Sequence, residues 1–459
     1  MIYRPYEYQA KATRFVIDHP NCGLFLDMGL GKSVITLTAI QDLIDNCEIS
    51  RVLVVAPKKV AETTWTTEAA KWDHLQDLRV SKVMGTEKQR KIALTEKADI
   101  YVIGRDNFVW LVGLYGGALP FDVLVIDELT SFKNSKSQRF KAMRIARPSV
   151  SRVIGLTGTP APNGLIDLWG QMYCIDMGER LGKSVTRYRE DHFETHKWNN
   201  IVVRCDVKKG HEEIIRDSIA DVCLSMQAKD YLQLPDMMMH TVPVEMSSAT
   251  MEAYTKFERE KVLEFKQEHE GETANILANS AAGLMNKLAQ FANGAVYDED
   301  RNVHEIHSEK IDKLAEIVEA ANGSSVLVFY QFKHDIPRIA KKLKGYRVEV
   351  YEGEKQLIDW NAGKIDVLLA HPASTAYGLN MQQGGHYIVW FGTGWDLELF
   401  QQANARLHRQ GQMYPVTVYK LVGAHTVDER ASASLESKKV KQQSLLDSLN
   451  YLINKYTNG

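Results

Sequence analysis

The chain alternates short apolar runs with segments of helical periodicity, and it does so in two separate stretches. Continuous apolar runs of this kind are typical of strands that are buried on both faces of a parallel sheet. They lie at residues 24–26, 51–57, 100–103, 121–126 and 153–156, and later at 326–330, 366–370, 387–391 and 416–421. Helical patterns lie between the runs, so the sequence predicts two α/β lobes with parallel sheets.

Residues 165–300 differ, because β-branched runs become sparse and helical periodicity dominates. We expect a first lobe over residues 1–300, with a helical protrusion from about 165 to 300, and a second lobe over residues 301–459. The run Met237–Met239 is interpreted as core or strand. The segment 428–458 carries an apolar stripe and predicts a C-terminal helix that packs back on its lobe.

Composition limits the classes of protein that fit. The 459 residues are 44% apolar, which is ample for large cores. The 56 basic and 58 acidic residues nearly balance, so any nucleic-acid surface must be local. The five cysteines are scattered without a C-x-x-C pair, which favours a reducing compartment and no zinc site. No apolar run reaches about 18 residues, so we expect no membrane span and an intracellular, cytoplasmic protein.

The first chemical motif is Gly23-Leu-Phe-Leu-Asp-Met-Gly-Leu-Gly-Lys32-Ser33. It reads as a strand, a glycine turn and a helix N-terminus, where backbone N–H groups and the helix dipole favour phosphate. Lys32 would reach the β- and γ-phosphates, and the Ser33 hydroxyl would bind Mg²⁺. The strict phosphate-loop pattern fails at its first glycine, which is Leu26 here. The alternative is a glycine-rich turn with a solvated lysine.

Two carboxylates, Asp127 and Glu128, directly follow the apolar run 121–126. Isolated buried charge is costly, and a Mg²⁺ ion would compensate it. Asp127 would hold the metal, directly or through water, and Glu128 would polarise the attacking water. The alternative is an exposed acidic turn, which the upstream phosphate loop disfavours.

Upstream of the phosphate loop, Tyr6 and Gln9 are candidates for the adenine side of a nucleotide. A glutamine amide offers both a donor and an acceptor, which suits an adenine edge. Taken alone, these residues favour the alternative interpretation, a surface helix.

Several polar residues follow predicted strands and are candidates for phosphate or nucleic-acid contacts, because ligands bind at the carboxyl ends of parallel strands. A solvated turn is the competing interpretation of Lys58 and Lys59, and a plain tight turn is that of Thr157 and Thr159. The candidates are Lys58, Lys59, Lys133, Asn134, Thr157, Thr159, Ser374 and Thr375.

The second lobe contains no phosphate loop, but it contains Gln402-Ala-Asn-Ala-Arg406-Leu-His-Arg409-Gln-Gly-Gln412. Arg406 and Arg409 would share one face if this segment is helical. Two guanidinium groups aimed at a γ-phosphate would act as arginine fingers. The alternative is a basic surface helix.

Taken in order, these motifs resemble the helicase-type ATPases of superfamily two, and among them the Swi/Snf-type (Snf2-like, chromatin-remodeller) family. The phosphate loop differs from that family at Phe25–Asp27, and Thr130 stands where the family has a histidine. The resemblance covers nearly the whole chain and is carried by Pro5–Gln9, Val54–Lys59, Met28–Ser33, Asp127–Thr130, Phe132–Asn134, Leu156–Pro160 and Gln402–Gln412.

The resemblance implies two RecA-like lobes of the P-loop NTPase type, with ATP and Mg²⁺ between them and helical insertions between the lobe cores. It implies a compact motor of bacterial or phage type that moves along double-stranded DNA. The implied catalytic residues are Lys32, Asp127, Glu128, Arg406 and Arg409, and the implied metal ligands are Ser33 and Asp127. The implied nucleotide contacts are Tyr6, Gln9, Met28, Gly29, Leu30, Gly31, Lys32, Ser33 and Gln402.

Two other functions remain open at this point. A strand-separating helicase or the motor subunit of a restriction system would use the same nucleotide site. A nucleotide-dependent scaffold would bind ATP with little turnover, and both pairs of catalytic residues argue against it.

Overall fold

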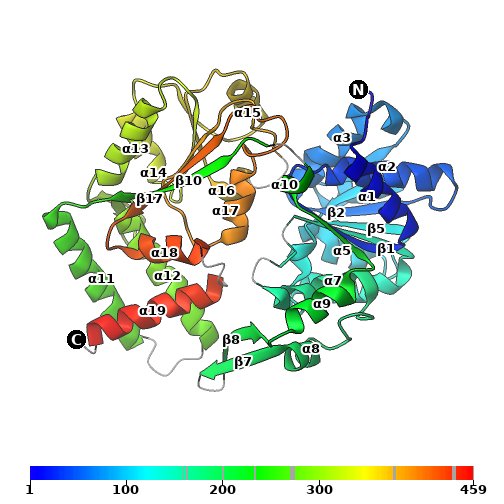
Figure 1. Cartoon of the computed structure of the whole chain (residues 1–459), viewed down its shortest axis with the longest axis horizontal. Helices are drawn as coiled ribbons and strands as arrows, with labels where there is room; N and C mark the ends of the chain where they lie inside the picture. The colour runs from blue at the N-terminus through cyan, green and yellow to red at the C-terminus, as the bar shows by residue number, and fades with distance from the viewer. Residues whose placement is uncertain are drawn as a thin grey trace. The chain divides into compact units, whose positions relative to one another are not determined.

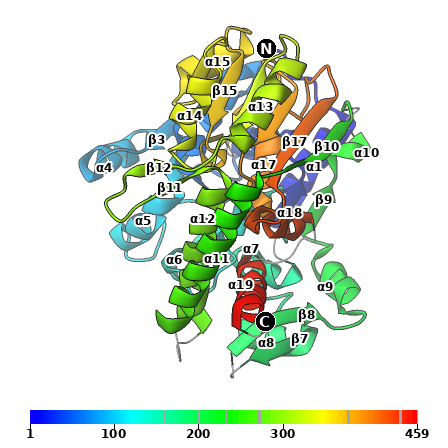
Figure 2. The ribbon, with the colours of Figure 1, turned by 90° about the vertical axis from the view of Figure 1, so that its left-hand side faces the viewer.

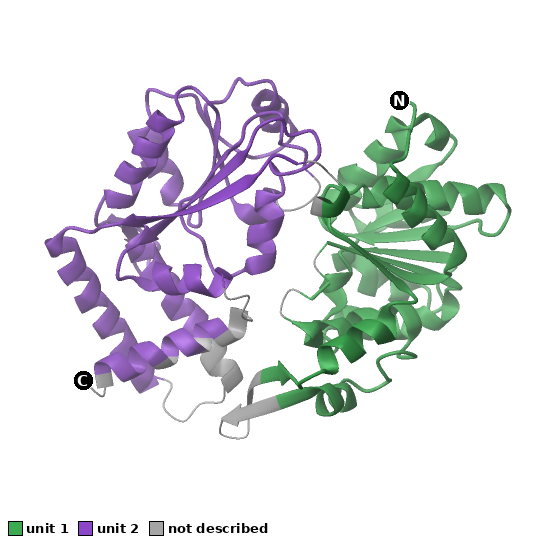
Figure 3. Cartoon of the chain, in the orientation of Figure 1, with its two compact units in different colours: residues 1–233 green, residues 234–459 purple. Residues whose placement is uncertain are grey.

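The computed structural model describes residues 1–158, 160–161, 164–198, 201–231, 234–268, 274–375, 379–436 and 441–457. The chain divides into two compact units, residues 1–233 and 234–459 (Figure 3).

The first unit is built on a seven-stranded sheet in the order β3-β4-β2-β5-β6-β1-β9, and every neighbouring pair is parallel (Figure 1). The central strands are apolar and almost completely buried, because helices cover both faces of a parallel sheet. The strands are β1 Asn21–Leu26, β2 Val52–Ala56, β3 Val80–Val83, β4 Ile100–Gly104, β5 Val123–Asp127, β6 Arg152–Thr157 and β9 Cys223–Met226.

Ten helices and a two-stranded antiparallel pair accompany this sheet in the described residues of the first unit. The antiparallel pair is β7 Phe193–Trp198 with β8 Ile201–Val207. The helices are α1 Glu7–Asp18, α2 Lys32–Asp45, α3 Trp65–Lys71, α4 Glu87–Thr95, α5 Phe108–Leu114, α6 Gln138–Ala146, α7 Leu168–Asp176, α8 Val185–His192, α9 His211–Ile219 and α10 Ala228–Tyr231.

The second unit has a six-stranded parallel sheet in the order β10-β17-β16-β13-β15-β14. Its strands are β10 Met237–Val244, β13 Val326–Phe329, β14 Val348–Val350, β15 Val367–Ala370, β16 Tyr387–Trp390 and β17 Val416–Gly423. Its helices include α13 Glu309–Ala320, α14 Asp335–Lys342, α15 Glu354–Asn361, α16 Pro372–Thr375, α17 Leu397–Asn404 and α18 Val427–Glu436.

A helical bundle packs at one end of the second unit. Helices α11 Ser248–Glu268, α12 Ala274–Ala292 and α19 Lys441–Thr457 lie side by side there (Figures 1 and 2). Their apolar faces share one core that includes Val262, Met285 and Leu449. A short antiparallel pair, β11 Ala295–Tyr297 and β12 Val303–Glu305, follows α12.

The prediction of two parallel α/β lobes is confirmed, and all nine predicted strands are present. The pattern missed β3, β9 and β14, and it indicated β10 only at Met237–Met239; these four strands form the edges of the two large sheets in the described residues. An edge strand is covered less completely, so its sequence need not be a continuous apolar run. Strand β10 shows this well, because Met237–Met239 are exposed; they form a strand, as expected, but no core.

Residues 165–300 are less uniformly helical than expected, since they also contain β7, β8, β9, β10 and β11. The boundary between the compact units also lies at 233/234, and not near residue 300. The physical reason is that β10 pairs along its whole length with β17, which brings the residues after 234 into the second unit. The expected C-terminal helix corresponds to α18 and α19, and residues 437–440 between them lie outside the described residues.

Membrane insertion finds no support in the helices that the structure describes, because none is both long enough and apolar enough to cross a bilayer.

Candidate active site

The first unit gathers three predicted motifs at one edge of its sheet. Strands β5, β6 and β1 are neighbours and parallel, so their carboxyl ends meet at the same edge. The phosphate loop leaves β1 there, Asp127 ends β5 and Thr157 ends β6. The sheet topology therefore brings together residues that are up to about 130 positions apart in sequence.

Two glycines give the phosphate loop its shape. Gly29 and Gly31 have φ angles of 87° and 85°, the left-handed region that glycine adopts without steric cost. A Cβ atom on Gly31 would lie 2.7 Å from Nε2 of Gln9, so a larger residue would also clash. Gly31 is the residue before α2, whose first backbone N–H groups have no helical acceptor and are available to an anion.

Lys32 is held inside this loop. Its Nζ donates hydrogen bonds to the carbonyl oxygens of Leu26, at 2.7 Å, and Asp27, at 3.3 Å. A Cβ atom on Gly158, just after β6, would lie 3.5 Å from the same Nζ. The ammonium group therefore lies between the carboxyl ends of β1 and β6, where a bound phosphate would meet the start of α2. Ser33 is the second residue of that helix.

Asp127, the last residue of β5, is half-buried, and its carboxylate has a defined partner. The indole Nε1 of Trp65 donates a hydrogen bond to its Oδ2 at 3.0 Å. Burial raises the pKa of Asp127, although the Trp65 hydrogen bond and the positive charge of Lys32 oppose that rise. A cation at this position would remove the cost of the buried negative charge.

Glu128 adopts a left-handed backbone conformation, with a φ of 57°. A non-glycine residue pays on the order of 1 kcal/mol for this conformation. The strained residue lies between the end of β5 and the short 3₁₀ turn Leu129–Phe132, so it redirects the chain just where the catalytic carboxylate is expected. Strain of this kind is concentrated at functional sites.

The oxygen groups at this edge fit a Mg²⁺ ion that arrives with a nucleotide. Mg²⁺ prefers oxygen ligands and is usually held by one or two carboxylates, water and substrate phosphates. The Ser33 hydroxyl and the Asp127 carboxylate are oxygen donors of that kind. No cluster of three or more His, Cys, Asp or Glu side chains that could hold a metal alone is found in the described parts of the chain.

The predicted adenine-side residues lie next to the phosphate loop. Gln9 is buried on α1, its Nε2 donates to the Leu30 carbonyl at 3.3 Å, and its Oε1 accepts from the Tyr6 N–H at 3.0 Å. Both ends of its amide are therefore engaged within the chain. Tyr6 precedes α1, is half exposed and stacks its ring on that of Tyr8, with centroids 5.7 Å apart.

The predicted arginine fingers lie in the second unit, just beyond α17. The hypothesis that they share a helix face is wrong, because α17 ends at Asn404 and the chain continues as turns. They nevertheless converge, since Arg406 Nη1 and Arg409 Nη1 both donate to the carbonyl of Leu379, at 3.4 and 2.9 Å. Arg406 is buried and Arg409 is half-buried.

Gln402, the remaining predicted nucleotide contact, lies on α17 itself. Its side chain is buried, and its Nε2 donates to Oε1 of Glu398 at 3.2 Å.

The lysine and asparagine candidates for nucleic-acid contact differ in their exposure and in the ion pairs and hydrogen bonds that they form. Lys58 and Lys59 follow β2 and are exposed, and Lys58 Nζ is 4.0 Å from Oε1 of Glu62. Lys133 forms a closer ion pair with Asp167, at 3.5 Å. The Asn134 side chain accepts a hydrogen bond from the backbone N–H two residues later.

The hydroxyl candidates are mostly buried. Thr157 is fully buried at the end of β6, and Thr159 lies outside the described residues. Ser374 and Thr375 lie on α16, where their hydroxyls donate to the carbonyls of His371 and Pro372. Thr375 is fully buried, so a contact with nucleic acid would require local rearrangement there.

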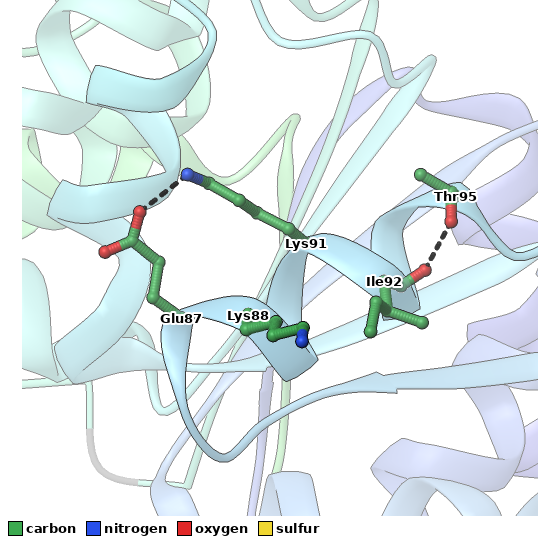
Figure 4. A pocket seen from close by; sticks show the side chains of 5 residues that line it. All are labelled: Glu87, Lys88, Lys91, Ile92 and Thr95. Carbon is green, nitrogen blue, oxygen red and sulfur yellow. Dashed lines mark hydrogen bonds and ion pairs between the residues drawn. The ribbon is translucent and has the colours of Figure 1, made fainter.

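A separate hollow on the first unit has no part in this site. It is lined by five residues of α4: Glu87, Lys88, Lys91, Ile92 and Thr95 (Figure 4). The carboxylate of Glu87 and the Lys91 ammonium pair with each other at 2.7 Å, and no predicted site residue contributes to the lining.

Sequence reasoning missed two residues that contact the site. One is Trp65, the partner of Asp127. The other is Asp27, whose Oδ2 accepts a hydrogen bond from the backbone N–H of Ala228 at 2.9 Å and so links the phosphate loop to α10. Neither has a local sequence signal, because both contacts join residues that are far apart in the chain.

Comparisons with known proteins agree with this arrangement. A sequence model of the SNF2-related domain matches residues 8–294, and one of the helicase conserved C-terminal domain matches residues 309–411. The chain is 36% identical to protein p41 of Acyrthosiphon pisum secondary endosymbiont phage 1, over 97% of this chain and 99% of that one. It is 26% identical to an ATP-dependent helicase of Mycoplasma genitalium, over 97% of this chain but 42% of that longer protein.

Among solved structures, the helicase domain of Hef from Pyrococcus furiosus is similar, with a TM-score of 0.54 at 14% identity, covering 95% of this chain and all of that one. That likeness concerns the two-lobe fold. Together with the family matches, it gives the two sheets their identity as RecA-like lobes. The chain belongs to the SNF2 family of helicase-like ATPases, and it hydrolyses ATP.

Proposed function

We propose that this protein is a motor that uses ATP hydrolysis to move along double-stranded DNA without separating the strands. The observation that carries the proposal is the set of charged residues that each unit brings together. The first unit places a lysine loop and two carboxylates at one sheet edge, and the second contributes a pair of converging arginines.

In the first unit, Lys32 would exchange its carbonyl partners for the β- and γ-phosphates of ATP, and the N–H groups at the start of α2 would bind the same phosphates. Ser33 and Asp127 would hold Mg²⁺, which would neutralise part of the phosphate charge. Glu128 would orient the attacking water and accept its proton.

In the second unit, Arg406 and Arg409 would contribute positive charge to the transferring phosphoryl group. They can do so only if the two units close on one nucleotide, so hydrolysis would depend on closure. DNA bound across both units would favour the closed state and thereby accelerate turnover. Repeated closing and opening would then move the units along the duplex.

DNA is the proposed partner for two reasons. The family resemblance implies a double-stranded DNA motor, and a relative 23% identical over 96% of this chain is named a DNA repair and recombination protein. The overall charge of −2 requires that the contact surface be local, and exposed Lys58 and Lys59 at the sheet edge are suitable. Because a relative is encoded by a phage, we place the protein in the cytoplasm of an infected bacterium.

The ATPase rate is expected to rise about tenfold or more with double-stranded DNA, a typical coupling between two ligands. The rate is measured without nucleic acid and with duplex DNA, single-stranded DNA and RNA. Movement is measured by displacement of a triplex-forming third strand, alongside a strand-separation assay on a forked duplex. We expect the third strand to be released and the duplex to stay intact.

Two lysine variants provide the controls. Lys32→Ala should lower the rate by about 10²–10³-fold, as for loss of one charge-stabilising donor. Lys208 is the matched control, because its Nζ also donates to two consecutive carbonyls, those of Glu190 and Asp191, and neither is a predicted site residue. Lys208→Ala should keep the wild-type rate. An ATPase rate indifferent to every nucleic acid would overturn the motor proposal, and separated strands would favour a helicase.

A further inference from the structure

We propose that Trp65 is a positioning residue for ATP hydrolysis: its indole N–H fixes one oxygen of Asp127 so that the other is presented to the metal. The inference rests on the proposed function of Asp127 as a metal-holding residue. The inference assigns a role to Trp65, which the sequence alone did not mark as a candidate site residue.

The contact is short and comes from a rigid group. Trp65 is completely buried, and its Nε1 lies 3.0 Å from Oδ2 of Asp127. An indole N–H is only a donor, so it cannot compete with the carboxylate for a cation. A hydrogen bond to a charged acceptor is also stronger than one between neutral groups.

The helix that carries this indole follows a strand that neighbours the strand of Asp127. Trp65 is the first residue of α3, which follows β2, and β2 lies beside β5 in the sheet. A π-helical turn, Val60–Thr64, leads directly into Trp65. Such turns are rare overall but are frequent at functional sites.

The consequence concerns the rotation of the carboxyl group. The terminal torsion of an aspartate is broad, so a carboxylate without a partner samples many orientations. The backbone N–H of Glu128 also donates to this carboxylate, and with Oδ2 held by Trp65 as well, the rotation of the group is restricted and Oδ1 has a defined direction. Partners of this kind orient metal-binding carboxylates, and their loss typically weakens metal affinity by about 10–100-fold.

The chain offers a matched control at the other end of the same helix, in the residue that follows it. Trp72 directly follows α3, and its Nε1 donates to Oε2 of Glu68, also at 3.0 Å. Both tryptophans thus donate to a carboxylate, but Glu68 has no place in the proposed site. Replacing each tryptophan by phenylalanine removes the same N–H group and keeps an aromatic ring.

The test measures metal binding without turnover. Mn²⁺ is titrated by electron paramagnetic resonance into the full chain with a non-hydrolysable ATP analogue, in wild type, Trp65→Phe, Trp72→Phe and Asp127→Asn. Trp65→Phe should weaken Mn²⁺ binding by about tenfold or more, while its metal-free affinity for the analogue stays within about twofold. Trp72→Phe should bind Mn²⁺ like wild type.

A second measurement covers the case in which Trp65→Phe does not fold. The chain has eight tryptophans, so ¹⁵N-labelled indoles give a small set of signals. The one signal that moves in Asp127→Asn belongs to the indole bonded to that carboxylate, and in wild type it should also move when Mg²⁺ is added with the analogue. If no indole signal responds to Asp127→Asn or to Mg²⁺, the inference is overturned.

The outcomes separate this inference from the proposed function. If Asp127→Asn abolishes Mn²⁺ binding but Trp65→Phe leaves it unchanged, Trp65 only fills the core and this inference is wrong. If Asp127→Asn itself leaves Mn²⁺ binding unchanged, the proposed metal site is wrong.

Discussion

Replacement of Glu128 by glutamine is expected to stop ATP turnover while leaving ATP binding intact. Glutamine has the size and shape of glutamate, so the strained turn after β5 can persist, but an amide cannot accept the proton of the attacking water. Loss of a general base typically costs about 10²–10⁴-fold in rate. The rate is measured at saturating ATP and duplex DNA, and binding is measured with a fluorescent ATP analogue.

The control for this prediction is Glu87→Gln. Glu87 lies on α4 in the same unit, and its carboxylate interacts with the side chains of Lys91 and Trp110, neither of which is a predicted site residue. That variant should hydrolyse ATP at the wild-type rate. If Glu128→Gln also turned over ATP within about twofold of wild type, the carboxylate would have no catalytic part. A nucleotide-dependent scaffold would then explain the chain better than a motor.

The second large effect is expected for Arg409→Ala, in the other unit. An arginine that stabilises charge on a transferring phosphoryl group is worth about 10³-fold or more in kcat. ATP should still bind, because the lysine loop in the first unit is unchanged. Arg409 suits this test better than Arg406, which is buried and also donates from Nε to the Gln402 carbonyl at 3.0 Å.

A lysine at the same position should restore little of the lost rate, because a point charge does not reproduce the planar guanidinium fork. The matched control is Arg347→Ala, which removes an exposed arginine paired with Asp366 in the same unit. Single-turnover rates and thermal melting are recorded for each variant. A fall in Tm with an unchanged rate in Arg409→Ala would show that the residue supports the fold and has no part in catalysis.

The sequence predicted the central strands of the two large sheets but not most of their edge strands. Central strands such as β4 and β13 are buried on both faces, and that burial requires a continuous apolar run. Edge strands such as β10 do not need a continuous apolar run, so it is their pairing with a neighbouring strand that makes them strands. The pairing of β10 with β17 also places the boundary between the units where no local signal marks it.

The site was predictable where its chemistry is local. Lys32 follows a glycine turn, and Asp127 ends an apolar run, so short segments identified both. Contacts made through the tertiary structure were not predictable. The bond from Trp65 to Asp127, the engagement of the Gln9 amide by Leu30 and the burial of Thr375 each depend on residues that the sheet brings together.

The arginine pair was predicted only in part. The spacing of Arg406 and Arg409 correctly indicated that the two guanidinium groups lie together, but the reason was wrong. They meet because both bond to the Leu379 carbonyl, from a turn that follows α17, and not because they share a helix face.

The central claim is that both units of this chain act on one triphosphate. A direct test uses an ATP derivative with a photoreactive azidoanilide on its γ-phosphate, bound to the full chain with duplex DNA and irradiated. Peptides that carry the label are then identified by mass spectrometry. We predict labelled peptides from the lysine loop, residues 23–33, and from residues 402–412, with both lost in Lys32→Ala. Labelling confined to the first unit, with and without DNA, would contradict the claim.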